Sequence, residues 1–143
     1  MKGFQAQVTE HASGLGTMPN EHPEVSSRMV HTLEIARYCP VSHNPLPGST
    51  LTIRYRVGEC LLEVYALKAY VEAYRGGHTD GTRNMEAMVQ QIARDCAAAL
   101  GVTVSVQADL LLHPEQQMRI RVTAAPKLDS AFLGVRGWPS RST

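Results

Sequence analysis

The chain has 143 residues with 43% hydrophobic content and a net charge of +1 at pH 7, which fits a single soluble globular domain without a general attraction to nucleic acid or anionic membranes. No apolar run is long enough to span a bilayer, and the first residues, MKGFQAQVTE, lack the apolar core of a signal peptide. The three cysteines are widely spaced and form no CxxC pair, so we expect no disulfide framework and a reducing, cytoplasmic location.

The composition divides the chain into three parts. Residues 1–28 are polar and contain several glycines and prolines, which predicts a flexible N-terminal arm. Residues 29–124 carry regular hydrophobic patterns, and we expect them to form one domain. Residues 125–143 again contain glycine and proline and are predicted to be a C-terminal tail.

The first half of the domain is predicted to contain two strands and a helix. Met29–Tyr38 is expected to be the first strand, and a proline-rich turn that begins at Cys39 follows it. Apolar and polar residues alternate strictly along Ser49–Val57, which predicts a second strand with one buried face. Apolar residues at helical spacing predict a helix over Leu61–Tyr74 that ends at Gly76-Gly77.

The second half of the domain is predicted to contain a helix and two strands. The helix should cover Arg83–Leu100 and carry an almost continuous apolar stripe. Cys96 lies on this stripe, so we expect it to be a buried core residue. Alternating patterns then predict strands over Val102–Leu110 and Met118–Val122.

This order of elements, β-β-α-α-β-β, predicts an α+β fold with a four-stranded antiparallel sheet. Both helices should cover one face of the sheet, and the alternation predicts a polar opposite face. Both edges of such a sheet would be open, and long exposed edges promote unwanted pairing. Closing several copies edge to edge into a barrel removes these edges, so we expect a ring-shaped homo-oligomer.

The same element order is similar to that of the tunnelling fold, whose members build barrels from several subunits and act on pterins and purines. Within it, Cys39–Arg75 resembles the QueF family of NADPH-dependent 7-cyano-7-deazaguanine reductases, with similarity over roughly residues 30–122. The turn CPVSHNP resembles the family's cysteine turn, which implies that Cys39 attacks a substrate nitrile to give a thioimide. The motif EVYALKAY resembles the family's nicotinamide-cofactor motif, which implies NADPH contacts from Glu63 and Lys68.

A third similar motif is RNMEAMVQQIARD, which places Glu86 in the first turn of the second predicted helix. In this fold class a glutamate at that place anchors the N–H groups of the heterocycle, so the resemblance implies that Glu86 binds the substrate. A carboxylate suits this role because it accepts two parallel hydrogen bonds. The helix N-terminus also favours its ionised form.

The sequence departs from the QueF pattern at several positions, two of which affect the groups expected around the substrate. The family has an aspartate for proton transfer seven residues after the cysteine, where this chain has Leu46. The family also has a histidine just before the anchoring glutamate, where this chain has Met85. His78 and Asp80, in a longer loop between the helices, are candidates to replace the missing groups. By sequence, His43 in the cysteine turn is the best-placed proton acceptor, and an imidazole titrates in the required range.

Two other interpretations remain open. Type IB GTP cyclohydrolases share this fold class and bind a metal next to a cysteine-proline turn, so Cys39, His43 and His113 could form a mixed Cys/His zinc site. Alternatively, the chain is a non-catalytic relative that has kept the scaffold and lost the chemistry, as Leu46 suggests. For both enzyme interpretations the expected partner is a small purine, deazapurine or pterin bound at subunit contacts. If the chemistry has been lost, we expect that neither NADPH nor a deazapurine or pterin binds.

Overall fold

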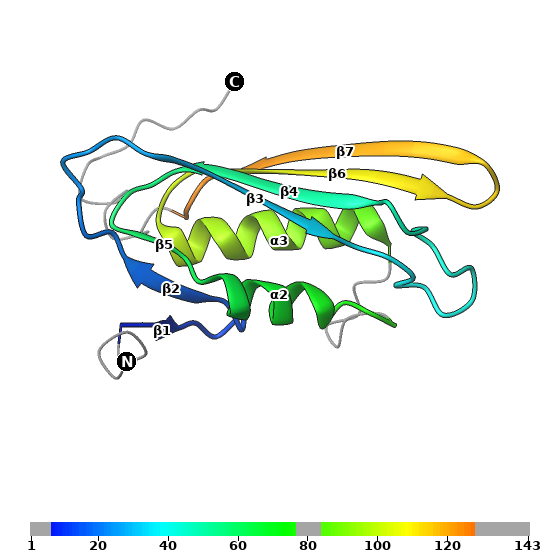
Figure 1. Ribbon diagram of the computed structural model, residues 1–143, viewed down its shortest axis with the longest axis horizontal. Helices are drawn as coiled ribbons and strands as arrows, with labels where there is room; N and C mark the ends of the chain where they lie inside the picture. Colours follow the sequence, from blue (N-terminus) through cyan, green and yellow to red (C-terminus); the bar gives the residue numbers. More distant parts are fainter. Residues whose placement is uncertain (1–6, 77–83, 128–143) are drawn as a thin grey trace, which may run out of the picture.

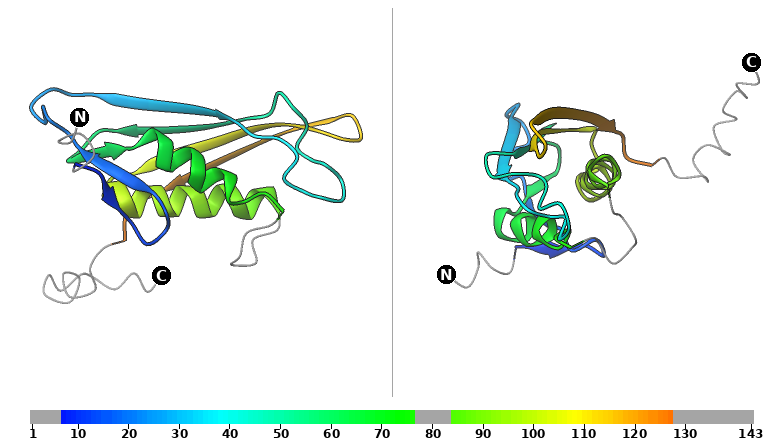
Figure 2. Two further views of the ribbon diagram at one scale, coloured as in Figure 1. Left: turned by 60° about the horizontal axis from the view of Figure 1, so that its bottom comes forward. Right: turned by 90° about the vertical axis from the view of Figure 1, so that its right-hand side faces the viewer.

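Four antiparallel strands form the main sheet of the protein, whose computed structural model describes residues 7–76 and 84–127. In spatial order they are β3 (Arg28–Glu34), β4 (Thr50–Arg56), β6 (Val104–Leu112) and β7 (Gln116–Ala124). Within the described residues two helices, α2 (Val64–Glu72) and α3 (Met85–Leu100), lie on one face of this sheet (Figures 1 and 2). The predicted α+β arrangement of antiparallel strands and two helices is therefore confirmed.

The register of the sheet separates an apolar face from a polar face. One row of paired residues across the helix-covered face consists of His31, Ile53, Val106 and Val122. The next row points away from the helices and consists of Thr32, Thr52, Gln107 and Arg121. Alternation in a strand sends neighbouring side chains to opposite faces, so the hydrophobic core forms on the helix-covered face of the main sheet.

Helix α3 forms the centre of this core and has a defined start and end. The side chain of Asn84 caps its N-terminus by accepting a hydrogen bond from the N–H of Ala87 at 2.7 Å. Gly101 ends it in the left-handed conformation with a φ of 71°, which glycine adopts without a steric cost. Cys96 is fully buried on its inner face, as the apolar stripe predicts.

Helix α2 is shorter than predicted because its expected first turn belongs to a strand. Strand β5 (Cys60–Leu62) pairs with β2 (Gly16–Pro19), and β2 pairs with β1 (Thr9–Glu10), so these segments form a second antiparallel sheet. Cys60, which directly precedes the predicted helix in the sequence, therefore lies in β5. Tyr70 of α2 donates a hydrogen bond of 2.5 Å to Asp95 of α3, which holds the two helices together.

The N-terminal region belongs to the fold from residue 7 onward and is not the flexible arm that composition indicates. Leu15 is fully buried, and the carbonyl of Gly16 accepts a hydrogen bond from the N–H of Glu63 at 2.8 Å. A Cβ at Gly16 would lie 3.1 Å from the Cβ of Ala66, so glycine permits the close approach to α2. Most of the predicted tail, from residue 128, lies outside the described residues.

The first strand is also shorter than predicted, because the chain turns sharply before Cys39. Arg37 has a left-handed φ of 59°, and its N–H donates to the carbonyl of Pro45 at 2.6 Å. The loop between β3 and β4 thus starts inside the predicted strand. Neither of the described helices combines the length and the apolar character needed to cross a membrane.

Candidate functional site

The loop between β3 and β4 holds Cys39 in a turn closed by backbone hydrogen bonds. The N–H of Cys39 donates to the carbonyl of Asn44 at 2.9 Å, and the N–H of His43 donates to the carbonyl of Cys39 at the same distance. The carbonyl of Tyr38 accepts a hydrogen bond of 2.7 Å from the N–H of Gly76, just beyond α2. The cysteine is therefore fixed by its own turn and by the end of a helix.

Polar side chains attach this loop to the end of β6. The Ser49 hydroxyl donates to the carbonyl of Leu46 at 2.8 Å and accepts from the N–H of Leu111 at 2.9 Å. The side-chain amide of Asn44 donates to the carbonyl of His113 at 3.0 Å and accepts from its N–H at 2.8 Å. These side-chain bonds replace strand pairing where the loop passes the sheet.

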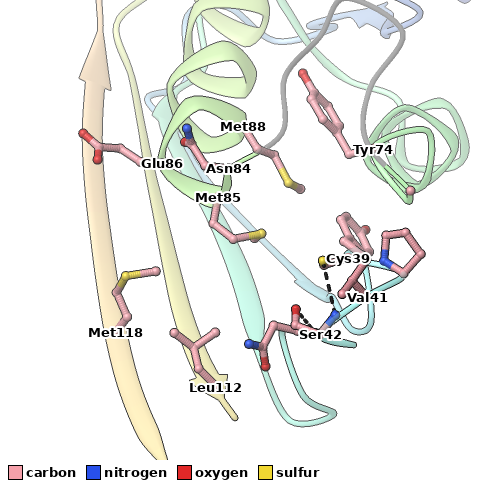
Figure 3. A pocket seen from close by; sticks show the side chains of 14 residues that line it. Cys39, Val41, Ser42, Tyr74, Asn84, Met85, Glu86, Met88, Leu112 and Met118 are labelled. Carbon is pink, nitrogen blue, oxygen red and sulfur yellow. Dashed lines mark hydrogen bonds between the residues drawn. The ribbon is translucent and has the colours of Figure 1, made fainter. Parts of the chain in front are cut away.

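A cavity of about 640 Å³ lies beside the loop, and Figure 3 shows the side chains around it. Its wall consists of the Cys39 turn, the end of α2, the first turn of α3, and side chains from β6 and β7. Its nonpolar side chains include two tyrosines, Tyr38 and Tyr74. The aliphatic and thioether side chains of the wall are Val41, Met85, Met88, Leu112 and Met118. The cavity is large enough for a small aromatic ligand and apolar enough to bury one.

The thiol of Cys39 faces this cavity (Figure 3). Hydrogen bonds from the Ser42 hydroxyl and from the backbone N–H groups of Ser42 and Val41 lower the pKa of Cys39, because they stabilise the thiolate. The N–H of Ser42 lies 3.5 Å from the sulfur. By contrast, burial raises the pKa of Cys96 to about 12 and also raises that of Cys60. The cysteine that the turn motif singles out is thus the one whose surroundings favour the reactive form.

The other residues predicted for catalysis and substrate binding are less closely associated with Cys39. His43 is exposed and does not contribute to the cavity wall. Its left-handed φ of 62° closes the turn. Glu86 does contribute to the wall, but its carboxylate lies on the β7 side of α3, away from Cys39 (Figure 3). His78 and Asp80 lie outside the described residues.

The structure does not bring the predicted cofactor residues to this cavity. The carboxylate of Glu63 caps α2, where it accepts hydrogen bonds from the N–H groups of Tyr65 at 3.1 Å and Ala66 at 2.6 Å. Lys68 is exposed along a separate groove of about 350 Å³ between β3 and α2. The capping role was hidden in the sequence because the helical pattern extends upstream of Glu63.

The alternative zinc site is not preformed within the described part of one chain. Across residues 7–76 and 84–127, no three His, Cys, Asp or Glu side chains cluster as a metal site would require. His113 is exposed, and its backbone carbonyl and N–H form the hydrogen bonds to Asn44 in the loop. Cys39, His43 and His113 are thus near one another along the loop and strand ends without forming a ligand set.

Two features of the cavity are absent from the sequence prediction. Met85 and Met88 extend from α3 toward Cys39, although their spacing indicates only a core stripe (Figure 3). The hydroxyl of Tyr38 is buried and has no hydrogen-bond partner within the described residues. Burial, with a further contribution from Glu72, raises the pKa of Tyr38 to about 12. Its position directly before Cys39 is the only signal that the sequence offered.

Comparison with known proteins adds no assignment to this geometry. No family model matches the sequence, and no curated protein matches it significantly.

Proposed function

We propose that the protein is a QueF-like enzyme of the tunnelling-fold class that binds a purine-like heterocycle in the Cys39 cavity. The preferred substrate is 7-cyano-7-deazaguanine. The observation that carries this proposal is a thiol with a lowered pKa that opens into an apolar cavity of about 640 Å³. Thioether groups such as those of Met85 and Met88 make favourable contacts with aromatic rings. The three free cysteines suit the reducing cytoplasm that we propose as its location.

The covalent step needs only the thiol and the nitrile. The sulfur of Cys39 forms a bond to the nitrile carbon, one C–N π bond breaks, and the nitrogen takes up a proton. The thiol loses one proton in the same step, so the adduct has the combined mass of protein and ligand. The hydrogen bonds around Ser42 increase the thiolate population, which explains how attack can proceed although Leu46 occupies the position of the family's aspartate.

Reduction of this adduct would require NADPH, which would supply hydride. The residues of one chain do not fit this cofactor at the Cys39 cavity, because Glu63 caps α2 and Lys68 lies along another groove. These residues of one chain therefore supply no group for the reductive step. NADPH remains part of the proposal only through the QueF resemblance, and its site would need groups from a neighbouring subunit.

A ring-shaped homo-oligomer is part of the same proposal. Strands β3 and β7 are the two edges of the main sheet, and pairing them between copies would satisfy their unpaired backbone groups. Pairing of this kind would place substrate sites at subunit contacts. There, Glu86, His78 and Asp80 could contribute to the binding of a heterocycle in the adjoining copy.

Intact-mass measurement after incubation with 7-cyano-7-deazaguanine tests the covalent step. We expect a mass increase equal to the whole nitrile, loss of the adduct in Cys39→Ala, and retention in Cys60→Ala. Peptide mapping should locate the modification at Cys39. Absence of any adduct with the folded wild-type protein would reject the nucleophilic mechanism and favour a cyclohydrolase-like or a non-catalytic binding role.

A further inference from the structure

Sulfur atoms from two distant segments of the chain, the β3–β4 loop and the start of α3, line the Cys39 cavity. Met85 and Met88 are three residues apart in the first turns of α3, so their side chains extend from the same side of the helix. Their sulfur atoms point toward the thiol of Cys39, which comes from the β3–β4 loop (Figure 3). The sulfur of Met118 lies at the other end of the cavity, beside β7.

The surrounding structure holds Cys39, Met85 and Met88 in place. Met88 is 3% exposed and belongs to the hydrophobic core, while Met85 is half-buried and packs against it. The Asn84 cap sets where α3 begins and therefore the direction of both methionines. The backbone of Cys39 is held by Asn44 and His43. The fold, and not one loop alone, therefore determines where these three sulfur-bearing side chains lie.

A thiolate with two thioethers is a soft ligand set, which selects Cu(I) over harder divalent ions. The charge of one thiolate balances that of Cu(I), so the complex would be neutral in a largely apolar cavity, where an unbalanced charge would be costly. The described wall contains no histidine, and its one carboxylate, Glu86, points away from the sulfur atoms. This surrounding disfavours zinc, for which imidazole and carboxylate ligands are more suitable.

We propose that the cavity binds Cu(I) through the sulfur atoms of Cys39, Met85 and Met88. Binding displaces the proton of the thiol and forms a copper–thiolate bond without a change in the oxidation state of copper. The copper-loaded thiolate cannot attack an electrophile. Copper therefore competes with the nitrile chemistry proposed above, although the metal site does not depend on that chemistry.

Anaerobic titration of the reduced full chain with the Cu(I)–bathocuproine complex tests the site. Wild-type protein should withdraw one ion per chain, and Cys39→Ser should lose this capacity although Cys60 and Cys96 remain. Met85→Leu and Met88→Leu should each weaken binding by about tenfold or more, which is a loss of about 1.4 kcal/mol. Met118→Leu is the matched control, because its sulfur is at the far end of the cavity, and it should bind like the wild type.

Two results would overturn the proposal. Tight binding by Cys39→Ser would assign the copper to other thiols, and wild-type affinity in the Met85→Leu/Met88→Leu double variant would indicate a thiolate alone. X-ray absorption of the copper-loaded wild type gives a measurement that does not require a variant to fold. It should show three sulfur neighbours, and nitrogen or oxygen neighbours in their place would reject the site. If the wild type binds copper but forms no nitrile adduct, the copper site is supported and the proposed function is rejected.

Discussion

At the scale of single residues, the three thiols differ in surroundings, and this difference predicts the order in which they react. Burial raises the pKa of Cys96 to about 12 and also raises that of Cys60, whereas hydrogen bonds lower the pKa of Cys39. Because the thiolate is the reactive form, iodoacetamide should label Cys39 first near neutral pH. Peptide mapping of briefly treated native protein measures this order, and earlier labelling of Cys96 would contradict it.

The contribution of Ser42 can be separated from that of His43. Ser42→Ala removes the hydroxyl that contributes most to the lowered pKa of Cys39, so its pKa should rise and alkylation near neutral pH should slow. The rate should recover at alkaline pH, where the thiol ionises without help. His43→Ala is the matched control, since this exposed side chain does not contribute to the cavity wall. If both variants change the pH profile equally, the lowered pKa of Cys39 depends on the turn as a whole and not on the Ser42 hydroxyl.

Tyr38 offers a second prediction at this scale. Its hydroxyl is buried without a hydrogen-bond partner in the described part of the chain. Such a group lowers the stability of the folded state, because it loses its hydrogen bonds to water on folding and gains none. Tyr38→Phe keeps the ring and the contact with Arg75, whose guanidinium carbon lies 5.6 Å from the ring centroid. We expect the free energy of unfolding to increase by about 1 kcal/mol in urea denaturation. Tyr65→Phe, at a position that is 80% exposed, should leave it unchanged. Destabilisation by Tyr38→Phe would show that the hydroxyl has a partner in solution.

At the scale of elements, α2 is held at its start by Glu63 and along its length by Tyr70. The Tyr70 hydroxyl contacts both Asp95 and Tyr74, and the second oxygen of Asp95 accepts a hydrogen bond from Gln91 at 2.9 Å. Burial and the bond to Asp95 raise the pKa of Tyr70, so this tyrosine remains neutral and acts as a donor. The helix that borders the Cys39 cavity is therefore positioned by polar contacts as well as by the core.

The cap of α2 distinguishes a structural role of Glu63 from a cofactor role. Glu63→Ala leaves two N–H groups of the first turn without their acceptor and should cost about 1 kcal/mol of stability. Glu63→Asp should retain most of that stability, because aspartate is a favourable N-cap residue. Lys68→Ala, a change at an exposed position, is the control and should have little effect. Thermal unfolding of the three variants measures the change in stability. If Glu63→Ala is as stable as the wild type, the cap is not the main role of Glu63, and a ligand-binding role is favoured.

At the scale of the whole molecule, side chains on the polar face of the main sheet are hydrogen-bonded to one another within and between strands. Arg119 pairs with Asp109 at 2.6 Å, Gln107 donates to Asp109 at 2.8 Å, and Arg121 donates to Gln107 at 2.9 Å. The hydrogen bonds from Gln107 and then Arg119 lower the pKa of Asp109. Polar side chains that are hydrogen-bonded to one another can remain in contact with water, so this face does not need to be covered. The open edges of the sheet are therefore the stronger reason to expect that copies of the chain associate.

The edges of the sheet therefore predict the oligomeric state. Strand β3 has seven residues and strand β7 has nine, and neither has a neighbour on its outer side in the described chain. We expect sedimentation velocity at micromolar concentration to show a closed homo-oligomer larger than a dimer. A monomer that stays monomeric over this range would contradict both the ring and the placement of sites at subunit contacts.

Periodicity in the sequence alone was sufficient to predict the main sheet and its helices. Strict alternation over Ser49–Val57 predicts a strand that the structure has as Thr50–Arg56, because burial of one face imposes a period of two on any strand. The apolar stripe likewise predicts α3 and a buried Cys96. The cysteine turn also directs attention to Cys39, since the pattern of prolines excludes regular structure there.

Tertiary structure decided the features that depend on pairing between distant segments. Strands β2 and β5 are too short to have a period of their own, so the residues of β5 also fit the start of a helix, and only pairing with β2 makes them a strand. The same holds for the cavity, where Cys39 lies opposite Met85 and Met88 only because the fold brings the β3–β4 loop and the first turn of α3 to the same space. Local patterns report which face of an element is buried, but the partner across that face is selected by packing of the whole chain.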